Sequence, residues 1–192
     1  MLTAMSAVEI FCRQVRSRSA EHREAIRRLS SMPGQIVAIL RQELDSLIRA
    51  IFLLAQTDRQ YRNYLIDAAV DGRKWTAKGS GKRLTDREMV DLANGLHGWT
   101  ESVYRFGCGF IHLSNLHDYR NRDALRQISD EEKAAMLGHL RYYHGGPVQE
   151  LPTFHDIVPF LPRVFEKVAD NLECYLRQLE NDGDLDEGNK KR

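Results

Sequence analysis

Apolar residues recur at every third or fourth position along most of the 192-residue chain, and no clear run of alternating apolar and polar residues appears. This spacing matches the turn of an α-helix and not the two-residue repeat of a strand. The most regular stretch runs from Gln35 to Gln56 and contains Ile36, Leu40, Leu44, Leu47, Ile51 and Leu54 at this spacing. We expect an all-α fold, a mostly antiparallel bundle of about six helices joined mostly by short loops.

Capping residues and helix breakers set the predicted boundaries of these helices. Thr85 with Glu88, and Ser129 with Glu132, follow the pattern of a capping box, in which both side chains satisfy free N–H groups at a helix start. The predicted helices run from about Thr3 to Ser31, Gln35 to Gln56, Asp58 to Asp71, Thr85 to Asn115, Ser129 to Tyr143 and Thr153 to Leu179.

Two of these predicted helices contain residues that disturb helical geometry. We expect the fourth helix to bend near Gly95 to Gly98, and Pro159 and Pro162 to kink or delay the last one. Residues 1–180 are predicted to form one helical domain. Residues 181–192 are polar enough to predict a disordered tail.

Charge, hydropathy and cysteine content narrow the class of protein. The chain has 28 basic and 27 acidic residues, a net charge of +1, so no overall basic field attracts nucleic acid or membranes. The most hydrophobic stretch, Ile36 to Ala55, is interrupted by four charged residues, so we expect no membrane contact. Cys12, Cys108 and Cys174 lie too far apart for a metal site or a disulfide framework. We predict a cytoplasmic protein with free thiols, no metal and no cofactor.

The two halves of the chain carry opposite net charges. Residues 1–83 hold 15 basic and 8 acidic side chains (net +7), and residues 84–192 hold 13 and 19 (net −6). Such an asymmetry favours either a basic surface on a neutral protein or head-to-tail pairing of two chains. The second possibility would suit a plain helical dimerisation domain. We expect a homodimer.

The segment from Trp99 to Asp118 is the most specific part of the sequence. On a continuous helix seven residues advance by 700°, so Arg105 and His112 would share one face, roughly 10 Å apart along the axis. Glu101 and Cys108 fall on the same stripe. This places a polar row along a helix whose opposite side is apolar.

Gly107 and Gly109 lie in the middle of this predicted helix, and each costs about 1 kcal/mol relative to alanine. We expect a compensating close approach by another helix, a second copy of this helix or a ligand. A purely structural alternative also exists. Glu101 and Arg105 would then be an ordinary i,i+4 ion pair, and His112 a hydrogen-bonded core histidine.

A basic loop runs from Gly72 to Leu84. Cations on such a loop can contact phosphates, and an aromatic ring among them can stack on a base. The candidate nucleic-acid-binding residues are Lys74, Trp75, Lys78, Lys82 and Arg83. The alternative is a flexible loop with no partner other than solvent.

The motif Arg105-FGCGFI-His112 resembles the Arg-x(4–6)-His motif of the HEPN (higher eukaryotes and prokaryotes nucleotide-binding) superfamily of helical domains. Phe110 to Ser114 is also similar to an aromatic-apolar-His-x-Ser pattern of uncharacterised bacterial HEPN-like families. Those families often have, well upstream, a helix that begins with charged residues and continues with apolar ones. Arg41 to Leu54 would correspond to that helix.

The resemblance implies a metal-independent ribonuclease, a toxin or phage-defence effector whose site forms at a dimer cleft. His112 would move the proton of a ribose 2′-hydroxyl or of the leaving oxygen, Arg105 would hold the phosphate, and Glu101 would orient Arg105. RNA and an antitoxin or other partner protein are the implied partners. Phe106 stands where active members usually place a polar residue, which favours the alternative: a non-catalytic HEPN-like module that binds a partner protein or a nucleotide.

Overall fold

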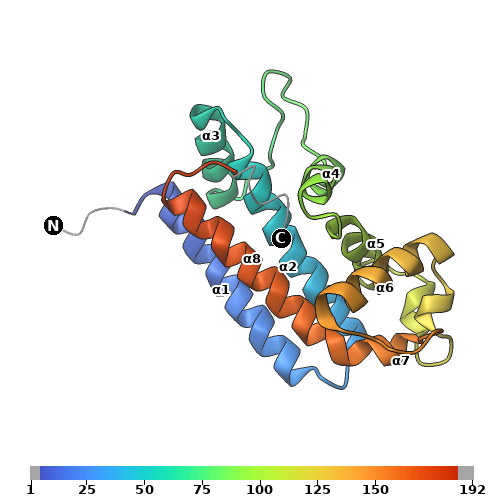
Figure 1. Cartoon of the computed structure of the whole chain (residues 1–192). Helices are drawn as coiled ribbons and strands as arrows, with labels where there is room; N and C mark the ends of the chain where they lie inside the picture. Colours follow the sequence, from blue (N-terminus) through green and yellow to red (C-terminus); the bar gives the residue numbers. More distant parts are fainter. Residues whose placement is uncertain (1–4, 186–192) are drawn as a thin grey trace.

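The computed structural model describes residues 5–185, and within this range the chain is an all-α bundle, as predicted (Figure 1). Its helices are α1 (Ala7–Arg28), α2 (Pro33–Leu54), α3 (Arg59–Val70), α4 (Asp86–His97), α5 (Thr100–Ile111), α6 (Asp130–His144), α7 (Phe154–Ile157) and α8 (Leu161–Glu180). Three short 3-10 helices, η1 (Asn115–Asp118), η2 (Ala124–Arg126) and η3 (Val158–Phe160), complete the order. No helix in the described range is long and apolar enough to span a membrane.

Helix α2 is the centre of the core. It is apolar around most of its circumference and buries 16 of its 22 residues. α1 and α8 lie along it as two further long helices, and α4 and α5 cover another side (Figure 1). A helix apolar on all sides is stable only when neighbours surround it, so α2 fixes where the others pack.

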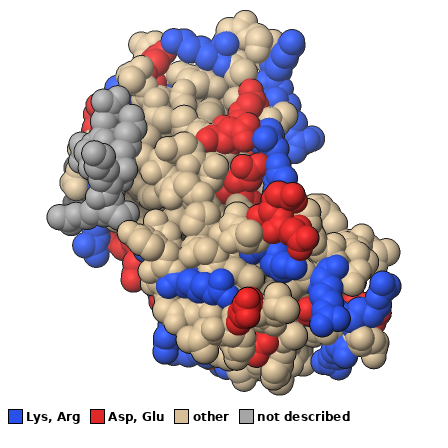
Figure 2. Space-filling view, turned by 45° about the vertical axis from the view of Figure 1, so that its right-hand side comes forward, with Lys and Arg blue, Asp and Glu red and all other residues tan. Residues whose placement is uncertain are grey.

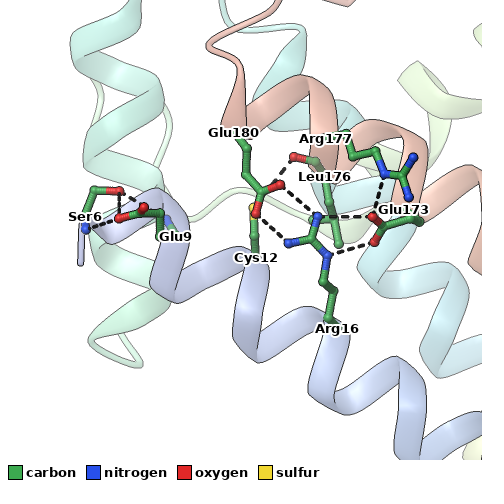
Figure 3. Close-up of polar contacts among 8 residues, drawn as sticks. All are labelled: Ser6, Glu9, Cys12, Arg16, Glu173, Leu176, Arg177 and Glu180. Atoms are coloured by element: carbon green, nitrogen blue, oxygen red, sulfur yellow. Dashed lines mark hydrogen bonds and ion pairs between the residues drawn. The ribbon is translucent and has the colours of Figure 1, made fainter.

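Helix α1 is fixed to α8 by polar contacts as well as by apolar packing (Figure 3). The Arg16 guanidinium lies between two carboxylates of α8, 2.8 Å from Glu173 and 2.5 Å from Glu180. The Cys12 thiol donates to the Leu176 carbonyl at 3.8 Å. Burial raises the pKa of Cys12 to about 11, so this thiol stays protonated and packs as a small core residue.

The predicted helix starts at Asp58, Thr85 and Ser129 are confirmed. The Asp58 side chain accepts hydrogen bonds from two N–H groups of α3, Thr85 and Glu88 form a complete capping box, and Ser129 caps the N–H of Glu132. These short oxygen-bearing side chains satisfy N–H groups that the first turn of a helix leaves free.

The prediction of one bent helix from Thr85 to Asn115 is wrong. Gly98 adopts a left-handed conformation (φ +73°) and ends α4, and a second helix then ends at Ile111. A glycine tolerates this conformation because it has no side chain, so it separates two helices at little cost. The two prolines divide the last predicted helix into α7, η3 and α8, which is the predicted delay.

The first residues of the predicted polar tail make hydrogen bonds to α2 and α3. Arg62, 2% exposed, donates to the carbonyl of Gly183 at 2.8 Å and to the carboxylate of Asp184 at 2.9 Å. The Leu185 N–H donates to the Leu54 carbonyl. Residues 181–185 thus cover the end of α2 and α3, and the rest of the predicted tail lies outside the described residues.

The two costly glycines of α5 are explained by packing within this chain. A Cβ atom on Gly107 would lie 2.6 Å from the Cβ of Arg41, which crosses it from α2. A Cβ atom on Gly109 would meet the side chain of Leu116. The close approach that the glycines predicted is therefore that of helix α2 and of the segment after α5.

We predict that Gly107→Ala lowers the free energy of unfolding by about 1–3 kcal/mol, because an added methyl group overpacks the contact with Arg41. Gly95→Ala is the matched control, since a Cβ atom on Gly95 has no neighbour within 4 Å. That change should stabilise the protein by roughly 0.5–1 kcal/mol. Urea unfolding measures both, and equal effects at the two positions would contradict this account of α5.

Candidate functional site

Arg105 extends from the exposed side of α5 and is shared by two carboxylates. Its guanidinium lies 2.8 Å from the carboxylate of Glu101, one turn earlier, and 3.4 Å from that of Glu132 on α6. Glu101 and Glu132 raise the pKa of the already cationic Arg105 further. The i,i+4 ion pair predicted as the structural alternative is present.

A shallow groove between α4, α5 and α6 surrounds this arginine. Its lining residues include Asn94, Glu101, Ser102, Arg105, Glu131, Glu132 and His139. Three carboxylates and one guanidinium line the groove, and a second guanidinium, that of Arg87, lies 3.7 Å from Glu101. The acidic side chains still outnumber the basic ones by one, so the groove carries net negative charge around neutral pH. A phosphodiester would meet repulsion here rather than a cationic cradle.

His112 lies outside this groove. α5 ends one residue earlier, and the backbone of His112 is extended (φ −95°, ψ 148°). Its side chain is exposed, and its carbonyl accepts a hydrogen bond from His117 at 3.1 Å. The prediction that Arg105 and His112 share one face of a continuous helix is therefore wrong, and no hydrogen bond or ion pair joins the two residues in the described chain.

The basic loop is anchored at its tryptophan. Trp75 is 5% exposed and stacks on Phe52 with ring centroids 6.0 Å apart. The prediction that Trp75 stacks on a base is therefore wrong, because its ring is buried. Lys78 pairs with Asp58 at 2.5 Å. The remaining predicted cations, Lys74, Lys82 and Arg83, are exposed, with no carboxylate of residues 5–185 within 4.0 Å. Basic side chains gather at the top of Figure 2, at the height of this loop in Figure 1.

A different feature, an apolar pocket, lies between α2, α5, α6 and α8. Its volume is about 60 Å³, and about 650 Å³ when the open space around its mouth is included. Its apolar lining consists of Val37, Leu40, Trp99, Val103, Phe106, Met136, Leu140, Ile157, Leu161, Val164 and Val168. α6 forms one wall with only three buried residues, Met136, Leu137 and Leu140.

The few polar side chains of this pocket gather at its edge. His139, Tyr143, His144 and Lys167 line it. Burial lowers the pKa of His139. Burial, together with the cations Lys167 and Arg163, lowers the pKa of His144. Both histidines are therefore shifted toward the neutral form.

Sequence reasoning missed this pocket for a physical reason. Trp99, Val103 and Phe106 belong to the apolar side of the predicted helix, but an enclosed space forms only where side chains from four separate helices fail to meet. Within the described part of the chain, no group of three or more His, Cys, Asp or Glu residues is placed to hold a metal.

Comparison with known proteins gives no family to which this chain can be assigned. No family model, no curated protein and no solved structure matches it. The functional argument therefore depends on the geometry of the chain itself.

We predict that the unliganded protein loses stability as the pH falls from about 7.5 to 5.5. A histidine whose folded pKa is below its ordinary value of 6.5 binds fewer protons than it does in the unfolded chain. The unfolded state then gains protons first, so the free energy of unfolding falls as the pH drops through 6.5. The double variant His139→Gln/His144→Gln should lose less stability over this range in chemical unfolding. An equal loss in both proteins would contradict the assignment.

Proposed function

We propose that this chain is a non-catalytic helical module that binds a small molecule in the pocket between α2, α5, α6 and α8. The pocket itself carries the proposal. Ligand sites are typically concave, mostly apolar, about 300–1,000 Å³ in volume, and edged by a few polar groups. The space under α6 matches this description in its apolar lining and its few polar groups, and its volume of about 60 Å³ is small for such a site.

The surroundings of Arg105 favour binding over RNA cleavage. A phosphate would have to displace Glu101 and Glu132 from the guanidinium and remain beside Glu131. The acid or base, His112, follows the end of α5 and would have to reach the phosphate from outside the groove or from a second copy in a homodimer. Both the HEPN resemblance and the homodimer stay predictions.

The two functions give opposite results with RNA. We expect no cleavage of labelled structured or unstructured RNA by the purified protein in EDTA. The matched control is His112→Ala, which should give the same result as the unchanged protein. Products with 2′,3′-cyclic phosphate ends that disappear in His112→Ala would instead establish the ribonuclease.

A series of linear alcohols tests the pocket directly. Each added methylene group that enters an apolar pocket contributes about 0.8 kcal/mol, so affinity should rise about fourfold per carbon from hexanol to nonanol. Trp99 lines the pocket and is one of two tryptophans, so its fluorescence reports binding once Trp75→Phe has removed the other.

Two matched substitutions locate the alcohol site. Val164→Phe places a larger side chain in the pocket and should abolish the change in Trp99 fluorescence. Val148→Phe adds the same bulk at a position that is 90% exposed and should leave binding unchanged. The proposal fails if affinity is independent of chain length or if Val164→Phe binds the alcohols normally.

A further inference from the structure

Lys167 stands where the apolar pocket opens to solvent. It lines both the pocket and a neighbouring open groove along α8, and it is half-buried. Its ammonium nitrogen lies 4.0 Å from the centre of the Tyr143 ring. The aliphatic stem thus follows the apolar wall while the charge faces the mouth, as long cationic side chains commonly do.

No carboxylate neutralises this ammonium. Among residues 5–185, no carboxylate lies within 4.0 Å of Lys167 or of Arg163, the other cation of the groove. Glu166 lines the same groove but pairs with Arg23 at 2.9 Å. Asp170 is the remaining acidic residue there, and it too lies beyond 4.0 Å from both cations. A partly buried lysine that contacts an aromatic ring but no carboxylate favours an anion supplied from outside the chain.

We infer that the pocket binds an amphipathic organic anion, a monocarboxylate with an aliphatic or aromatic body, whose apolar part lies under α6 and whose carboxylate meets Lys167. This inference rests on the proposed function and names the chemical class of its ligand. The depressed pKa of His144, caused in part by Lys167 and Arg163, agrees with a positive potential at this mouth.

The same geometry argues against a nucleotide in this pocket. Eleven of its fifteen lining side chains are apolar, and the polar ones lie at the edge. A purine or pyrimidine buried there would leave most of its ring nitrogens and oxygens without hydrogen-bond partners, which is costly. A hydrocarbon chain has no polar atoms, so its burial leaves no hydrogen-bond partner missing.

Octanoate and octanol, two probes that differ in charge but share the same chain length, test the inference. Titrations followed by Trp99 fluorescence use the full chain carrying Trp75→Phe, with and without Lys167→Met. Charge-assisted hydrogen bonds contribute about 1.5–3 kcal/mol, so Lys167→Met should weaken octanoate binding by about tenfold or more. Octanol binding should change by less than about twofold, because it makes no such contact.

Lys82→Met is the matched control, since Lys82 is an exposed lysine of the basic loop and lies outside the pocket lining. It should bind both probes like the parent, and Lys167→Arg should retain most of the octanoate affinity. If octanol binds but Lys167→Met does not weaken octanoate, the inference is overturned and the proposed function stands. If neither probe binds a folded protein, the proposed function fails as well.

Discussion

The burial of α2 on nearly every side is the constraint on which the rest of this fold depends. A helix with 16 buried residues out of 22 requires cover from several directions, and α1, α8, α4 and α5 supply it. The buried charged residues of α2 also need partners from the surrounding helices. Glu43, fully buried, is satisfied by His22 at 2.7 Å and by Ser19 at 2.5 Å, both from α1. Arg41, 4% exposed, lies over the Tyr104 ring of α5 at 3.5 Å.

The pocket forms where α6 packs only loosely over α2, α5 and α8. Val37 and Leu40, in the first half of α2, form part of its wall together with residues of α5 and α8. α6 closes this side with three buried residues, and polar links to its neighbours, such as Ser102 with His139 at 3.3 Å, complete the attachment. A helix held by so few apolar contacts leaves space beneath it, and the space is apolar because α2, α5 and α8 are apolar where they face it.

Local chemistry in the sequence predicted the helices well, and the candidate site poorly. Capping by Asp58, Thr85 and Ser129 depends on residues within one turn, so it can be recognised without the fold. The end of α4 at Gly98 could have been predicted in the same way, because glycine is the usual residue after the last turn of a helix. A bend was predicted there instead. The end of α5 was missed because Ser114, whose hydroxyl donates to the Gly109 carbonyl at 2.6 Å, competes locally with helix continuation.

The candidate site depends on contacts between distant segments, and the spacing of residues along one helix gives no information about such contacts. Glu132 reaches Arg105 from α6, Phe52 holds Trp75 away from solvent, and Lys167 meets Tyr143 across two helices. Each of these contacts changed the interpretation of a residue that the sequence had singled out or passed over. Gly107 is the clearest case, since its small size serves the passage of Arg41 and not the approach of a ligand.

The most direct test of the central claim is to follow the two tryptophan indole N–H signals by NMR while octanoate is added. Both tryptophans are 5% exposed, but only Trp99 lines the pocket, whereas Trp75 packs on Phe52 outside the pocket lining. The account predicts a saturable shift of the Trp99 signal with the Trp75 signal unchanged. An unmoved Trp99 signal, or equal shifts of both, would contradict it.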